Sequence, residues 1–178
     1  MNRNYRRTIS NKFGDEILRD PGCILLSDDE SDFWEIVDKV DFRSDILVEI
    51  GTARGISTLL LLELSHRIFT FDIKEYPIKY EIWESICGSF QPKISSQIIA
   101  SSEQTSHLLK GVQFDAAFID GFHRYDSIKY DINMLKKCGN ILFHDYDWRS
   151  VEQAIQELHK EEGGVLTVLN KYAHWRSA

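Results

Sequence analysis

Short apolar runs and longer amphipathic segments alternate along this chain from residue 45 to residue 162. The short runs are rich in β-branched and aromatic residues, as strands are, and they occupy residues 45–50, 67–73, 95–100, 114–120 and 140–145. The segments that follow them have helical length and cover residues 55–64, 78–90, 103–111, 125–138 and 150–162. Strands that alternate with helices in this way are typical of a parallel sheet.

The two ends of the chain extend this pattern. Residues 27–40 show the periodicity of a further amphipathic helix, and residues 165–169 and 172–177 are two short strand-like runs. We therefore predict an α/β fold: a doubly wound, mostly parallel Rossmann-like sheet with helices on both faces and a short C-terminal antiparallel hairpin. Residues 1–27 are expected to be an irregular N-terminal segment, and residues 28–178 a single domain.

Length and composition restrict the class of protein. With 178 residues, of which 43% are hydrophobic, the chain can bury the core of one domain. The longest apolar run, residues 56–64, is too short to cross a bilayer, and the basic start lacks the apolar segment of a secretory signal. The formal net charge of −7 argues against nucleic acid as the main partner. Three cysteines without a CxxC pair suit a reducing compartment, and we expect a cytoplasmic protein.

Carboxylates stand at the ends of four predicted strands. They are Glu49, Asp72, Asp120 and Asp145. In open parallel sheets, ligands bind outside the carboxyl ends of the strands, near the point where the strand order reverses. We therefore expect these side chains to share one edge of the sheet, where their mutual repulsion requires a cationic or hydrogen-bonding ligand.

A glycine turn separates the first predicted strand from the helix that follows it. Gly51 permits a tight turn close to a ligand, Gly55 lets the helix begin near the sheet, and Ala53 stands where a third glycine is common. Asp72 lies near the offset of about 20 residues at which an acid binds a ribose diol. The glycine spacing does not match the GxGxxG of dinucleotide sites, and Glu49 would repel a diphosphate. S-adenosylmethionine, which carries an ammonium group, a sulfonium and a ribose, suits these residues better; alternatively, both acids only cap neighbouring helices.

Taken together, these segments resemble a known family. The set "VEIGTARGIST", "FTFDI", "IIASSEQ", "FDAAFIDGFHRYDSIKYDINML" and "GNILFHDY" is similar to the class I S-adenosylmethionine-dependent methyltransferases. It is most similar to the small-molecule O-methyltransferase-like branch with IDGxHxY and HDY segments, over roughly residues 45–150. The resemblance implies an enzyme that methylates a hydroxyl of a sugar or a phenol-like compound, with a divalent metal ion in some members.

The resemblance also implies a role for each matching position. The methionine part of the cofactor would lie against the glycine turn, Asp72 would take the ribose hydroxyls, and the segment after the third strand would meet the adenine. The cofactor-binding residues implied in this way are Glu49, Gly51, Thr52, Ala53, Asp72, Ser101, Ser102, Glu103 and Asp120.

Methyl transfer to oxygen requires the acceptor hydroxyl to lose its proton and to lie in line with the methyl group. His123, with an ordinary imidazole pKa of about 6.5, is the candidate catalytic base beside Asp120; alternatively, it only orders its loop. Asp120 and Asp145 match the metal-binding carboxylates of the divalent-ion branch. His144, or alternatively Asp147, is the candidate third ligand for Mg²⁺ or Mn²⁺, and an imidazole there favours Mn²⁺ or another borderline ion over Mg²⁺. The alternative is that His144 only pairs with a neighbouring acid.

Several alternatives stay open. Tyr125, Tyr146 and Trp148 either form an apolar wall for the acceptor or pack beneath helices. The chain could be a non-catalytic cofactor-binding module or subunit, a methyltransferase acting on nitrogen or on a nucleic-acid end, or a hydride-transfer enzyme. Because no large insertion is present to build an acceptor pocket, a second copy in a homo-oligomer could complete the site. We expect a small-molecule hydroxyl acceptor as partner, and no membrane.

Overall fold

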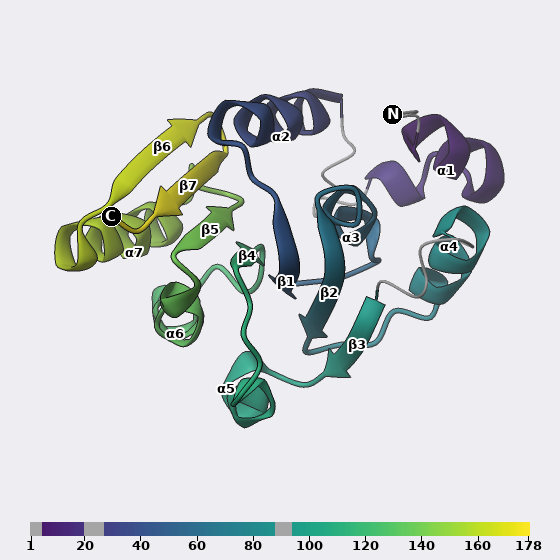
Figure 1. Cartoon of the computed structure of the whole chain (residues 1–178). Helices are drawn as coiled ribbons and strands as arrows, with labels where there is room; N and C mark the ends of the chain where they lie inside the picture. The colour runs from purple at the N-terminus through teal and green to yellow at the C-terminus, as the bar shows by residue number, and fades with distance from the viewer. Residues whose placement is uncertain (1–4, 20–26, 88–93) are drawn as a thin grey trace.

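The computed structural model describes residues 5–19, 27–87 and 94–178, which form a seven-stranded sheet between two layers of helices (Figure 1). The strands are β1 Ser44–Ile50, β2 Ser65–Asp72, β3 Ile94–Ile99, β4 Ala116–Ile119, β5 Asn140–Phe143, β6 Val165–Leu169 and β7 Tyr172–Arg176. The helices are α1 Tyr5–Phe13, α2 Ser27–Val40, α3 Ile56–Leu61, α4 Ile78–Cys87, α5 Ser102–Thr105, α6 Tyr125–Leu135 and α7 Arg149–Glu162. Short 3₁₀ turns cover Ile17–Arg19, Ser106–Leu109 and Lys136–Cys138.

The strand order is β3-β2-β1-β4-β5-β7-β6, and the first five strands in this order are parallel. The order reverses between β1 and β4, where Ile50 pairs with Ile119 and the Asp120 N–H donates to the Ile50 carbonyl at 2.8 Å. The last strand of the chain, β7, inserts antiparallel between β5 and β6. The predicted doubly wound sheet with a C-terminal antiparallel hairpin is therefore confirmed.

The central strands β1, β4 and β5 are buried on both faces, with α1 to α4 covering one side of the sheet and α5 to α7 the other (Figure 1). Successive side chains of a strand point to opposite faces, so Leu47 joins the core beneath α2, α3 and α4, whereas Val48 joins the core beneath α6 and α7. Both side chains are fully buried. Each contributes roughly 1.5–3 kcal/mol of hydrophobic stabilisation. Burial on both faces explains why consecutive positions of this strand, Ile46 to Val48, are apolar.

The N-terminal segment differs from expectation. Residues 5–13 form helix α1, so the prediction of an irregular segment was wrong there, while residues 1–4 and 20–26 lie outside the described part. Ile9 is fully buried, and Phe13, one helical turn later, packs against the same core. Two apolar side chains are a weak periodic signal, and tertiary packing against α4 decides the conformation.

Helix α3 is shorter than the predicted segment, because the chain turns after Leu61 and β2 begins at Ser65. The Ser44 N–H donates to the Leu64 carbonyl at 3.0 Å, which fixes this turn against the start of β1. The last part of the predicted helix 78–90, beyond Cys87, lies outside the described residues.

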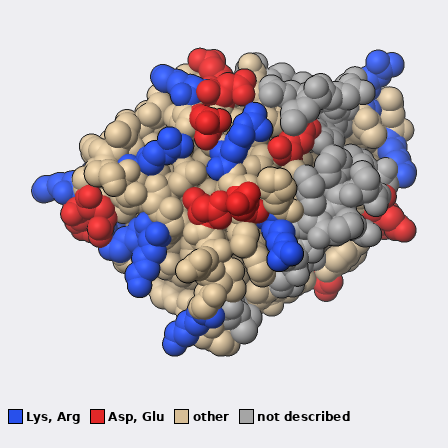
Figure 2. All heavy atoms as spheres, in the orientation of Figure 1, with Lys and Arg blue, Asp and Glu red and all other residues tan. Residues whose placement is uncertain are grey.

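The surface carries charges of both signs. On the face shown in Figure 2, the acidic and basic side chains of the described residues are interspersed rather than gathered by sign. None of the helices in the described ranges is both long and apolar enough to cross a membrane.

Candidate functional site

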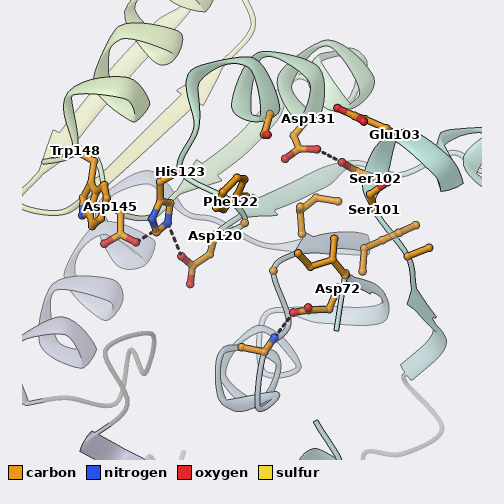
Figure 3. Close-up of a pocket in the computed structure, with 18 of the residues that line it drawn as sticks. Asp72, Ser101, Ser102, Glu103, Asp120, Phe122, His123, Asp131, Asp145 and Trp148 are labelled. Atoms are coloured by element: carbon orange, nitrogen blue, oxygen red, sulfur yellow. Dashed lines mark hydrogen bonds and ion pairs between the residues drawn. The ribbon is translucent and has the colours of Figure 1, made fainter. Parts of the chain in front are cut away.

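A cavity of about 690 Å³ opens at the carboxyl ends of the parallel strands, where the strand order reverses. It is lined by the segments that follow β1 to β5 and by the turn between β6 and β7. Figure 3 shows His123 and Asp145 on one side of it, Ser102 and Asp131 on the other, and Asp72 below Ser102 on a third wall. This is the edge of the sheet at which the sequence predicts the strand-end carboxylates.

The glycine turn forms one wall of the cavity. Gly51 has a φ of +91° and lies close to the end of the neighbouring strand β4. An added Cβ would stand 1.9 Å from the carbonyl oxygen of Asp120. Ala53 also adopts a left-handed conformation, with a φ of +44°, which is where a glycine is common. The strained alanine directs its N–H to Asp72 Oδ2 at 2.6 Å. The turn and the acid at the end of β2 are therefore locked to each other.

Asp72 is held by two backbone donors. Oδ2 accepts from Ala53, and Oδ1 accepts from the Lys74 N–H at 2.9 Å. Each carboxylate oxygen keeps a second lone pair, and the side chain lines the cavity. A fixed carboxylate with remaining acceptor capacity is suited to a pair of ribose hydroxyls.

Glu49 and Thr52, both predicted to bind the cofactor, do not line the cavity. Glu49 is fully buried and accepts hydrogen bonds from Ser57 Oγ at 2.6 Å and Thr58 Oγ1 at 2.7 Å, both on α3. Burial raises the pKa of Glu49 to about 7, while these two hydroxyl donors oppose the rise. Thr52 donates to the Phe71 carbonyl at 3.1 Å. In this structure the two side chains fasten the glycine turn to α3 and to β2.

The segment after β3 supplies another wall. Ser101 caps α5 by accepting from the Gln104 N–H at 3.2 Å, and Gln104 Oε1 accepts from the Ser101 N–H at 3.3 Å. Ser102 donates a hydrogen bond to Asp131 of α6. Ser101, Ser102 and Glu103 all line the cavity, as the prediction of an adenine-binding segment requires.

Two histidines and two aspartates meet at the other end of the cavity. His144 Nδ1 lies 3.1 Å from Asp120 Oδ1 and 3.3 Å from Asp145 Oδ2. His123 Nε2 lies 2.9 Å from Asp145 Oδ2 and 3.9 Å from Asp120 Oδ1. Asp145 has a φ of +54°, a left-handed conformation that aspartate tolerates better than most residues, and it places the carboxylate between the two rings. The predicted catalytic and metal-binding residues thus form one cluster.

The charges in this cluster stabilise one another. The nearby carboxylates of Asp120 and Asp145 raise the pKa of His123 to about 9, against the effect of burial. Burial disfavours the charged form of His144, yet the same two carboxylates raise the pKa of this ring to about 10. The pKa of Asp145 lies well below its usual range, since the two adjacent histidines outweigh its burial. The prediction of a base used an ordinary imidazole pKa, and the neighbouring carboxylates change that premise.

Three of these groups could hold a cation. Donor atoms of Asp120, His144 and Asp145 all lie within 4.8 Å of one another, and both carboxylates line the cavity. Carboxylate oxygens with one imidazole nitrogen suit a borderline divalent ion. However, His144 Nε2 is buried without a hydrogen-bond partner among the described residues, whereas a metal-bound histidine generally has its second nitrogen satisfied. The donor set therefore fits a cation chiefly through its carboxylates.

Exposed aromatic rings stand at the mouth of the cavity. Trp148 is 53% exposed with its ring centroid 4.8 Å from that of His123, and Phe122 is 61% exposed. Tyr125 instead donates to Glu157 of α7, and Tyr146 accepts from a side chain of the same helix. Of the three aromatic residues for which a cavity wall and packing beneath helices were both open, Trp148 lines the cavity, and no sequence pattern pointed to Phe122.

Two further charged residues of the cavity escaped the sequence analysis. Lys171 comes from the turn between β6 and β7, and no local signal places it near the other site residues. The sequence does contain a signal for Asp131, because this acid stands on the apolar stripe of α6 together with Ile128, Ile132 and Leu135. An acid on the buried side of an amphipathic helix is unusual unless it has a partner.

Comparison with known proteins agrees with this geometry. A family model described as a methyltransferase domain matches residues 48–146, which include the glycine turn, Asp72, His123 and Asp145. A comparison with curated protein sequences finds no match.

Solved structures share the fold. The O-methyltransferase TomG from Streptomyces achromogenes, involved in tomaymycin synthesis and solved in complex with SAM, superposes with a TM-score of 0.66 at 13% identity, over 98% of this chain and 90% of its own. An O-methyltransferase from Bacillus cereus in complex with SAH gives 0.67 at 16% identity, over 97% and 96%. The SAH-bound methyltransferase PaMTH1 from Podospora anserina gives 0.64 at 15% identity, over 91% and 84%. At these identities the likeness shows the doubly wound fold.

Proposed function

This chain belongs to the family that carries this methyltransferase domain, and from that premise we propose that it transfers a methyl group from S-adenosylmethionine to a hydroxyl oxygen of a small molecule, a sugar or a phenol-like compound. The resemblance to class I methyltransferases indicated by the sequence motifs is confirmed by the family match and by the fold. That similar structures hold SAM or SAH supports the choice of methyl donor.

One observation carries the proposal: the cavity at the switch point is lined by carboxylates. They are Asp72, Glu103, Asp120, Asp131, Asp145 and Asp147, and Lys171 is the one Lys or Arg among the lining residues. Such a cavity attracts a ligand with a sulfonium and an ammonium group and disfavours a diphosphate. S-adenosylmethionine fits such a cavity, because it carries an amine and a ribose and has no phosphate.

The donor's position follows from the walls of the cavity. Asp72, held by Ala53 and Lys74, takes the ribose hydroxyls. Ser101 and Ser102 lie where the adenine is expected, so the methionine part extends along Gly51 toward Asp120. The methyl group then faces the cluster of two histidines and two aspartates. Glu49 and Thr52 hold the turn from behind, and we propose no contact between their side chains and the donor.

Proton removal from the acceptor is assigned to His123, which lines the cavity. Because its pKa is raised to about 9, the ring accepts a proton only after losing its own. The positive charge of the methyl donor near Asp120 and Asp145 favours that loss, since it offsets the two carboxylates that stabilise the imidazolium. Asp120 and Asp145 thus orient His123 and set its charge state.

A divalent cation, Mg²⁺ or Mn²⁺, is part of the proposal. Asp120 and Asp145 would hold it, with His144 as the third donor. The chemistry that a cation would supply there is a lower pKa of the acceptor hydroxyl. The apolar faces of Phe122 and Trp148 at the mouth would receive the rest of the acceptor.

The test is binding followed by turnover. Calorimetric titration should give micromolar affinity for S-adenosylhomocysteine and no binding of NAD, because a diphosphate meets the carboxylates of the cavity. Methyl transfer from isotopically labelled S-adenosylmethionine should then be detected with at least one compound of a panel of catechols and sugars. Preferential binding of NAD would contradict the proposal. Binding of S-adenosylhomocysteine without transfer to any acceptor, including amines and nucleic-acid ends, would instead favour the non-catalytic module.

Two finer predictions accompany this function. The cytoplasmic location is inferred from the cysteine content, and it stays a prediction. The exposed rings of Phe122 and Trp148 support the idea that a second copy of the chain completes the acceptor site. Sedimentation of the purified protein would distinguish monomer from dimer.

A further inference from the structure

Asp131 is a buried carboxylate that borders the cavity, and no contact with the methyl donor has been assigned to it above. It extends from α6, exposes only 3% of its surface and lines the cavity. In Figure 3 it faces Ser102, on the side opposite His123 and Asp145. Within the described ranges, the hydroxyl of Ser102 is the one hydrogen-bond donor to this carboxylate.

A single hydroxyl does not satisfy a buried carboxylate. An ionised carboxyl group offers about four acceptor positions, and burying one without partners is costly. Burial raises the pKa of Asp131 to about 6, although the hydrogen bond from Ser102 opposes this rise. The other buried positions of α6, such as Ile128 and Leu135, are apolar. The position therefore suits a ligand that brings a further hydrogen-bond donor into the cavity.

The methyl donor has few groups that can supply this hydrogen bond. Its ribose hydroxyls are accounted for by Asp72 on another wall, and its sulfonium has no N–H or O–H. Its ammonium lies at the end near Gly51 and Asp120. The exocyclic amino group of adenine is the remaining donor, and the adenine is expected beside Ser101 and Ser102, where Asp131 borders the cavity.

We propose that Asp131, positioned by Ser102, accepts a hydrogen bond from the exocyclic amino group of the adenine and thereby selects adenine over bases that lack this amine. The proposal rests on the proposed function, because it takes S-adenosylmethionine as the ligand. A hypoxanthine base presents a carbonyl oxygen at the same position, and this oxygen would face the carboxylate with two acceptors opposed. A site built around a hydrogen-bond donor rejects an analogue that lacks it, since the buried partner is left unpaired.

The test compares two ligands on two proteins. S-adenosylhomocysteine and its deaminated analogue S-inosylhomocysteine differ at this position of the base, and calorimetry gives the ratio of their dissociation constants. We expect the wild-type protein to prefer the adenine compound by about 10-fold or more. In Asp131→Asn the amide can donate to the hypoxanthine carbonyl, so the ratio should fall at least about 10-fold. Asp126→Asn is the matched control: the same change on the same helix, at an exposed acid outside the cavity.

The outcomes separate this inference from the function on which it rests. Equal affinity of the wild type for the two ligands, or an unchanged ratio in a folded Asp131→Asn variant, would overturn the role of Asp131 while leaving the methyl donor in place. If the wild type bound neither ligand, the proposed function would fail and the inference with it. If Asp131 had only a structural role, Asp131→Asn would weaken the binding of both ligands alike. The wild-type ratio does not depend on the variant folding, and circular dichroism checks that the variant does.

Discussion

Glu49 offers a measurable consequence of the way the glycine turn is built. Its carboxyl group is fully buried between β1 and α3, and burial raises its pKa from the ordinary 4.5 to about 7. Below pH 4.5 the group is protonated in both the folded and the unfolded chain. As the pH rises through 4.5 and then 7, the unfolded chain releases this proton first, so stability is lost over that range.

The size of the loss follows from the two pKa values. Their difference corresponds to about 3 kcal/mol of unfolding free energy, at about 1.4 kcal/mol for each pH unit. The variant Glu49→Gln keeps the shape and removes the titration. Its amide can accept from Ser57 and donate to the hydroxyl of Thr58, which is both donor and acceptor. The stability of the variant relative to the wild type should therefore rise by about 2 to 3 kcal/mol between about pH 5 and about pH 8.

Urea unfolding at several pH values measures this directly, with the fluorescence of the buried Trp83 and Trp175 as the signal. Other titrating groups affect both proteins alike and cancel in the difference. Glu152→Gln, an exposed acid on α7, is the control for which no such trend is expected. If the difference in unfolding free energy between Glu49→Gln and the wild type stayed constant with pH, the reasoning would be refuted. Such a result would show that Glu49 is ionised at low cost inside the fold.

The remaining predictions concern the cavity. Asp72→Ala removes the partner of the Ala53 N–H and the proposed ribose ligand, so calorimetry should show S-adenosylhomocysteine binding weakened by about 10- to 100-fold; unchanged affinity would contradict this role. Gly51→Ala forces a Cβ against the Asp120 carbonyl and should lower the unfolding free energy by about 2 kcal/mol or more in urea titrations, and an unaltered midpoint would argue against the close approach. His123→Ala should spare this binding but reduce methyl transfer about 100-fold or more in a turnover assay, and full activity would remove it as the base. EDTA treatment should reduce turnover and Mn²⁺ should restore it, whereas no loss would leave the carboxylates as positioning groups only.

The amino-acid sequence by itself determined the order of the elements and the place of the site. Alternating strand and helix periods specify a parallel sheet, and the carboxyl ends of parallel strands share one edge, so Asp72, Asp120 and Asp145 had to come together there. Local pattern also sufficed for the glycine turn and for the hairpin, because both depend on neighbours in the chain. It was insufficient for helix α1, whose few apolar residues become decisive only when they pack against the core.

Only the tertiary structure decided which charges line the cavity and in what state. Glu49 points toward α3 rather than toward the cavity, because side chains alternate along a strand and it shares the face of Leu47. Asp131 and Lys171 join the site from elements that the local pattern did not connect with it. Likewise, the raised pKa of His123 depends on Asp145 from the loop after β5 as well as on Asp120, three residues earlier in its own loop. Burial and electrostatics depend on what packs around a group, and these neighbours come from distant parts of the chain.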